Sequence, residues 1–112
     1  MSRFKLGLVA ALALAAATAL PAAALGGAHA ARGHTVMLQN FGFHPGNLSI
    51  NRGDSVTWVW RDQTEHNVTF HSSHSHTQVH GTYTLRFNRA GTFKYECTIH
   101  VSEGMRGKIV VH

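Results

Sequence analysis

Apolar and β-branched residues alternate with polar residues in short runs along most of the chain. A period of two is typical of strands that bury one face, and no helical period follows residue 30. In the run Val56-Thr57-Trp58-Val59-Trp60 the even positions are bulky, so that face should look into a core. Strands are predicted over residues 35–39, 48–50, 55–60, 67–70, 82–87, 92–96 and 108–111.

Turn-forming residues separate these runs. They occur at His44-Pro45-Gly46, at 52–54, at 89–91 and in the glycine-containing stretch 104–107. Many short strands at this spacing predict an all-β sandwich or barrel. Since no linker or repeat divides the pattern, we expect one domain over residues 31–112.

Residues 1–30 follow a different pattern. Arg3 and Lys5 precede an apolar run over 6–20, and small residues then lead to Ala28-His29-Ala30. This order predicts a secretory signal peptide cleaved after Ala30. The alternative is an uncleaved membrane anchor, but the apolar run is shorter than the roughly 20 residues of a spanning helix. We therefore expect a periplasmic or secreted protein without stable membrane insertion.

Composition narrows the function classes. Without the leader's two basic residues the chain has eight Lys and Arg against five acidic residues. It shows no basic run interleaved with aromatics, which argues against nucleic-acid binding.

Cys97 is the single cysteine, so no intramolecular disulfide can stabilise this small domain. A metal bond would both protect that thiol and add folding energy. A monomer is the default expectation.

The last third of the chain carries the chemistry. Cys97, His100 and Met105 stand in a C-x₂-H-x₄-M spacing between two predicted strands, and His66 follows the Trp58 strand. Taken singly, each residue type is more often structural. Together they offer the two imidazoles, thiolate and weak axial thioether that are diagnostic of a mononuclear blue-copper site. Zinc is the competing metal, although a thioether is a poor fourth ligand for it.

These motifs resemble those of the small cupredoxins, the plastocyanin, pseudoazurin and amicyanin group. The resemblance implies a Greek-key β-sandwich of about eight strands, one copper ion cycling between Cu(I) and Cu(II), and one-electron transfer. It also implies that redox partners dock transiently near His100, with Phe43, Pro45, Val101 and Met105 as the rim. The matching segments are 43–45, 53–58, Asp62, 66–68, 90–95 and the ligand loop with its trailing Gly-x-Ile-Val-Val.

Two positions depart from the family pattern. Trp60 stands where many relatives have an asparagine that braces the ligand loops. Glu65 stands where many have a proline, directly before His66. We hypothesise that the Glu65 carboxylate favours Cu(II) and lowers the reduction potential. The alternative is a solvated side chain whose charge is screened.

Other functions remain to be weighed. The segment 71–80 contains His71, His74, His76 and His80, which could bind a second metal ion weakly or form a solvated loop. Such a loop would suit the runner-up function, copper storage, delivery or tolerance. An oxidase or nitrite reductase is disfavoured by the chain's size and by the lack of a second defined ligand set. We therefore expect an electron carrier and not an enzyme.

Overall fold

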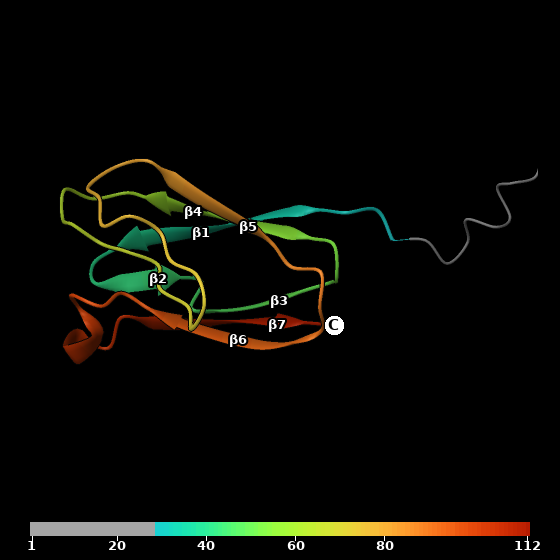
Figure 1. Cartoon of the computed structure of the whole chain (residues 1–112). Coiled ribbons are helices and arrows are strands. Elements are labelled where there is room, and N and C mark those ends of the chain that lie inside the picture. The colour runs from blue at the N-terminus through green and yellow to red at the C-terminus, as the bar shows by residue number, and fades with distance from the viewer. Residues whose placement is uncertain (1–28) are drawn as a thin grey trace, which may run out of the picture. The chain divides into compact units, whose positions relative to one another are not determined.

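The computed structural model describes residues 29–112, and this part of the chain contains seven strands. They form two sheets, ordered β2-β1-β4-β5 and β3-β7-β6, which lie as two layers (Figure 1). The elements are β1 (Gly33–Gln39), β2 (Gly42–His44), β3 (Asn47–Ile50), β4 (Ser55–Trp60), β5 (Thr82–Arg86), β6 (Gly91–Glu96), the short 3-10 helix η3 (Val101–Glu103) and β7 (Arg106–Val111). The expected all-β sandwich is confirmed, with seven strands where the resemblance implied about eight.

The predicted signal peptide over residues 1–30 lies almost wholly outside the described residues. Its cleavage and the start of the domain at Ala31 therefore stay predictions. Within residues 29–112, no helix is long and apolar enough to cross a membrane.

Strand pairing follows the alternation in the sequence. β1 pairs with β4 and β3 with β7 in parallel, whereas β4 with β5 and β6 with β7 are antiparallel. Val56, Trp58 and Trp60 on β4 are buried, as their even spacing predicted. The inward faces of the two sheets thus supply the core, as in other aligned sandwiches.

The predicted strand over residues 67–70 is wrong, because only isolated bridges form there. The Asn67 amide donates to Cys97 Sγ (3.4 Å) and the Val68 amide to Ser75 Oγ (2.9 Å). For these two amides, side chains take the place of a neighbouring strand as acceptors, whereas the Thr69 amide donates to the carbonyl of Glu96 in a single bridge. The segment keeps strand-like composition because it is buried, and its backbone serves the loops around Cys97 instead of a ladder.

Strand β2 was not predicted. It pairs with β1 through a two-residue turn, Asn40 and Phe41, whose φ angles are 54° and 56°. Both values belong to a type I′ hairpin turn, which usually contains glycine at its second position. A phenylalanine there removes the usual sequence signal for a hairpin.

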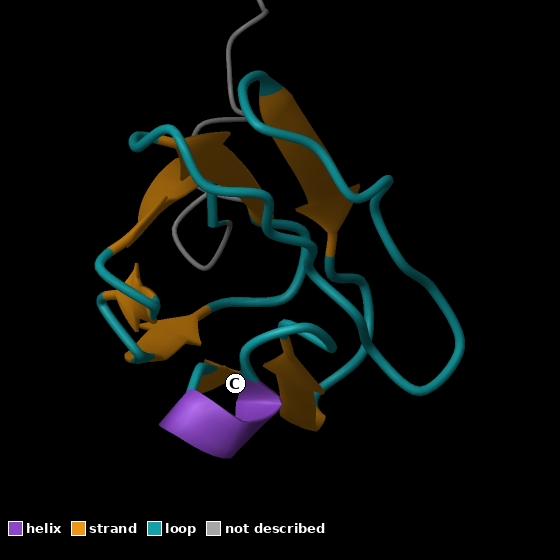
Figure 2. Ribbon diagram, turned by 90° about the vertical axis from the view of Figure 1, so that its left-hand side faces the viewer, coloured by secondary structure: helices purple, strands orange, loops and turns teal. Residues whose placement is uncertain are grey.

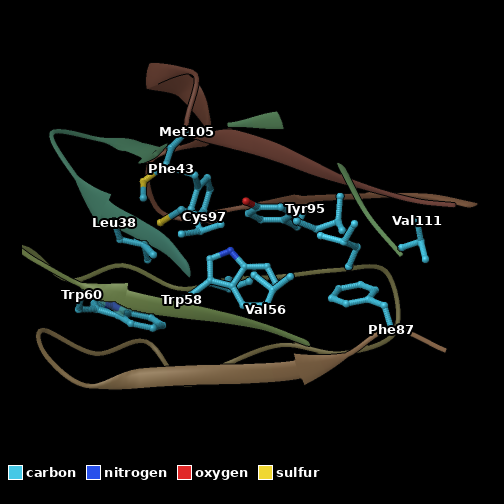
Figure 3. Packing of buried hydrophobic residues seen from close by; sticks show 14 residues of the cluster. Leu38, Phe43, Val56, Trp58, Trp60, Phe87, Tyr95, Cys97, Met105 and Val111 are labelled. Carbon is cyan, nitrogen blue, oxygen red and sulfur yellow. The ribbon is translucent and has the colours of Figure 1, made fainter. Parts of the chain in front are cut away.

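The core is centred on Trp58. Its ring packs edge-on against Tyr95 and Phe70, with centroids 5.3 and 5.7 Å away. Figure 3 shows Cys97 and Met105 at one end of the same cluster, with their sulfur atoms directed to the same side. Because both side chains are fully buried, this end of the core and the predicted ligand loop are continuous.

Candidate metal centre

The loop between β6 and β7 folds back on itself. The amide of His100 donates to the carbonyl of Cys97 (3.2 Å), and the amide of Cys97 donates to the carbonyl of Met105 (3.1 Å). Helix η3 then ends at Gly104, whose φ of 86° is the left-handed conformation that glycine adopts without strain. Figure 2 shows the short helix of this loop, η3, at the end of the sandwich that faces the viewer. The sequence-predicted loop between β6 and β7, which contains Cys97, His100 and Met105, also contains this helix.

Three of the predicted ligands converge. The potential donor atoms of His66, Cys97 and His100 all lie within 4.8 Å of one another. His100 Nδ1 is 3.2 Å from His66 Nδ1 and 3.5 Å from Cys97 Sγ. His66 and Cys97 are fully buried, while His100 is partly exposed. Two imidazoles and a thiol beside the buried Met105 are the donor set that a type-1 copper ion requires.

Asn67 is a functional residue that the sequence analysis did not single out. Its Oδ1 accepts from the Thr98 amide (3.0 Å) and from Thr69 Oγ1 (2.8 Å). Its Nδ2 donates to Thr98 Oγ1 (2.8 Å) and Thr77 Oγ1 (3.0 Å). Asn67 thus joins the segment of His66 to the residue that follows Cys97. Its position directly after the upstream histidine was the available signal.

Trp60 contacts the segment of His66. Its buried indole Nε1–H donates to the backbone carbonyl of His66 at 3.0 Å. The hydrogen bond fixes the backbone of one predicted ligand from strand β4. The loop of His66 and the loop of Cys97 are joined by the hydrogen bonds of Asn67 to Thr98.

Asp62 contacts His66 directly, with His66 Nε2 2.9 Å from Asp62 Oδ1. The Thr64 amide also donates to Oδ1, and the Asn40 amide donates to Oδ2, each at 3.1 Å. Burial acts to raise the pKa of Asp62, but these hydrogen bonds and the charge of His66 outweigh it and hold that pKa below its usual value. The carboxylate is therefore an ionised acceptor.

The surface around His100 differs from the predicted rim. Phe43 and Met105 are buried, so their assignment to an exposed rim is wrong. Phe41 and Ile99 are instead 47% and 46% exposed, and the Phe41 ring packs edge-on to His100 with centroids 4.7 Å apart. The chain reverses at Phe41, which puts Phe43 on the inner face of β2 and leaves Phe41 outside.

The histidine segment does not form a second cluster of the same kind. Among residues 29–112, the group of His66, Cys97 and His100 is the one set of three or more potential ligands held close together. His74 and His76 are exposed, and His74 Nδ1 donates to the carbonyl of Ser75 at 2.9 Å. Weak metal binding by two of these side chains stays a prediction. Glu65 is exposed too, which favours the solvated alternative for its charge.

Comparisons with known proteins agree with this donor set. An amicyanin-alpha from Methylorubrum extorquens is 36% identical over 114 residues, covering 90% of this chain and 94% of that protein. A chloroplastic plastocyanin from Tetradesmus obliquus is 31% identical over 83 residues, covering 62% of this chain and 57% of that protein. This chain therefore spans little more than half the length of that plastocyanin.

Solved structures show the same fold. An oxidized mutant of amicyanin superimposes with a TM-score of 0.64 at 31% identity, covering 70% of this chain and 81% of the other. A sequence model described as copper binding proteins, plastocyanin/azurin family, matches residues 31–112. The buried histidine–cysteine cluster thus lies in a chain that belongs to the plastocyanin/azurin family of copper-binding proteins.

Proposed function

We propose that this protein is a type-1 copper protein that carries single electrons between exported or membrane-bound redox partners. The observation that carries the proposal is the convergence of His66, Cys97 and His100 in a buried group. We assign Met105, which lies at the same end of the core, as the weak axial ligand (Figure 3). The family supports copper as the cofactor.

The residues have separate parts. A bound copper ion would supply a one-electron couple, Cu(I)/Cu(II), whose potential responds to the axial ligand and to the surroundings of the cysteine sulfur. Cys97 provides the anionic donor, and its sulfur accepts a hydrogen bond from the Asn67 amide. The hydrogen bonds of Asn67 and Trp60 hold the loops in place. A preformed site changes little between oxidation states, which favours fast transfer.

Burial supports a carrier and not an enzyme. His66, Cys97 and Met105 are fully shielded, and His100 alone of the four is partly exposed. A substrate molecule would find no free path to the donor atoms, whereas an electron can pass through the His100 ring. We therefore propose that partners dock at the apolar surface formed by Phe41 and Ile99, next to His100.

The compartment and assembly are also proposals. The leader-like pattern of residues 1–30 supports export to the periplasm or beyond. We propose a monomeric domain over residues 31–112. Mass spectrometry of the secreted protein should give the mass that begins at Ala31.

The central test is spectroscopic. The purified protein with one equivalent of Cu(II) should show an intense blue thiolate-to-copper band in the visible spectrum and narrow copper hyperfine splitting in EPR. Cys97→Ser should lose the band, whereas Met37→Leu, a methionine on the outer face of β1, should keep it. A colourless wild-type protein would overturn the proposal.

A second test addresses the docking surface. Ile99→Lys places a charge beside His100, and Ser72→Lys adds the same charge in the loop after residue 70. Electron self-exchange between two copies, measured by NMR line broadening, should slow at least about tenfold in the first variant and change little in the second, after correction for net charge. Equal rates in the two variants would exclude this surface.

A further inference from the structure

Asp62 lies where the loop that precedes His66 meets the turn at Asn40. Its Oδ1 contacts His66 Nε2 and its Oδ2 accepts from the Asn40 amide, 22 residues earlier in the chain. A carboxylate oxygen accepts, so the 2.9 Å contact with Asp62 requires a hydrogen on His66 Nε2. With Nε2 occupied in this way, Nδ1 is the nitrogen that can bind a metal ion, and it is the atom that faces His100 Nδ1 and the cluster.

Asp62 Oδ2 acts on His100 indirectly, through the turn at Asn40 and Phe41. The Asn40 amide that it holds begins the turn whose next residue, Phe41, packs its ring against His100 at 4.7 Å. Phe41 adopts a left-handed φ of 56°, which costs a residue with a side chain roughly 1–2 kcal/mol relative to glycine. A bulky residue kept in that conformation, half exposed, indicates a role for its ring beyond folding.

We propose that Asp62 is a positioning residue that holds both histidines of the metal centre, His66 through Oδ1 and His100 through the turn that seats Phe41. The proposal rests on the proposed copper site. Carboxylates that accept from the remote nitrogen of a ligating histidine fix its tautomer and strengthen it as a donor. A stronger donor with a nearby negative charge favours Cu(II) over Cu(I), so Asp62 lowers the reduction potential.

The experiment compares two carboxylates of one loop. Asp62→Asn keeps the shape and one acceptor but removes the charge, while Glu65→Gln removes an equal charge from the exposed residue beside His66. In Asp62→Asn the Cu(II) affinity should fall about 10–100-fold, the range seen when such partners of metal ligands are changed. Each tenfold loss of Cu(II) affinity beyond that of Cu(I) raises the potential by about 59 mV. Glu65→Gln should shift it far less.

A readout on the metal-free protein makes the inference independent of copper. In wild type, ¹⁵N NMR of the His66 ring should show hydrogen on Nε2, and the Asn40 amide should be protected from hydrogen exchange. In Asp62→Ala the Asn40 amide should lose protection, and the His66 ring should populate both tautomers. If the ring and the Asn40 amide are unchanged in Asp62→Ala, Asp62 does not position either segment.

The outcomes separate the two proposals. A wild-type protein without the blue band refutes the copper function, whatever Asp62 does. A blue wild-type protein whose potential shifts equally in Asp62→Asn and Glu65→Gln refutes the role of Asp62 and leaves the copper function standing. A blue protein with the larger shift in Asp62→Asn supports both.

Discussion

Asn67 should be a principal source of stability for the metal-free protein. Its side chain is 5% exposed and takes part in four hydrogen bonds that link Thr69, Thr77 and Thr98. We consider Asn67→Ala, which removes all four without adding bulk. The Thr77 and Thr98 hydroxyls belong to exposed residues, so water can replace their bonds to Nδ2. The two bonds to Oδ1, including the one from the Thr98 amide, are harder to replace.

The size of the loss follows from these bonds. A net hydrogen bond contributes about 0.5–1.5 kcal/mol, so the two bonds to Oδ1, with a smaller contribution from the two bonds that water can replace, give a loss of about 2–4 kcal/mol in the free energy of unfolding. For a domain of this size each kcal/mol lowers Tm by about 4–8 °C, which puts the decrease at about 8 °C or more. Because Asn67 joins the two ligand loops, the blue band of the copper-loaded variant should also change.

The assay is urea unfolding of the metal-free protein, followed by tryptophan fluorescence. Asn88→Ala, at an exposed position after β5, is the matched control and should stay within about 0.5 kcal/mol of wild type. If Asn67→Ala is as stable as Asn88→Ala, the hydrogen bonds do not brace the loops as the structure indicates. An unchanged m-value would show that the comparison is between like transitions.

Three further predictions concern the core and the metal. Gly107→Ala puts a Cβ 2.5 Å from the Tyr95 ring and should cost about 1–3 kcal/mol of unfolding free energy by denaturation, whereas Gly33→Ala, with no contact under 3.7 Å, should cost little. Equal losses would contradict the packing argument. Trp60→Phe removes one of two hydrogen bonds to the His66 carbonyl, which keeps the one from the Gln78 amide, and should cost about 0.5–1.5 kcal/mol by urea unfolding; a neutral effect would exclude that bond as a brace. Adding copper to a hundredfold excess over Kd should stabilise the protein by about 2.7 kcal/mol in calorimetry, and no rise in Tm would count against a native-state site.

Local periodicity was enough to predict the strands that bury one face. The run 55–60 has a bulky residue at every second position, and β4 occupies the same residues with that face inward. The C-x₂-H-x₄-M spacing likewise placed Cys97 and His100 in one loop, and the structure brings His66 to them. The strands depend on residues that are close together in the chain, and the ligand spacing is typical of few sites other than blue-copper sites.

Features that depend on long-range contacts were not predictable. Residues 67–70 have the composition of a strand, but the amides of Asn67 and Val68 bond to the side chains of Cys97 and Ser75. Gly107 was expected to bend the backbone, yet its missing side chain instead leaves space for Tyr95 on the neighbouring strand. The contact of Asp62 with Asn40 requires two turns to meet, which no local pattern records.

The burial of Cys97 and Met105 has a consequence for how fast metal is exchanged. Chelators and thiol reagents cannot touch either sulfur while the loop over residues 98–104 is closed, because both side chains are fully shielded. Exchange must then wait for that loop to open, an event that costs less than unfolding the sandwich. We expect the half-life of bound metal in excess chelator to follow the loop's opening rate and to be independent of chelator concentration. The closed loop would thus act as a kinetic barrier, so that retention of the ion need not track the equilibrium affinity of its ligands.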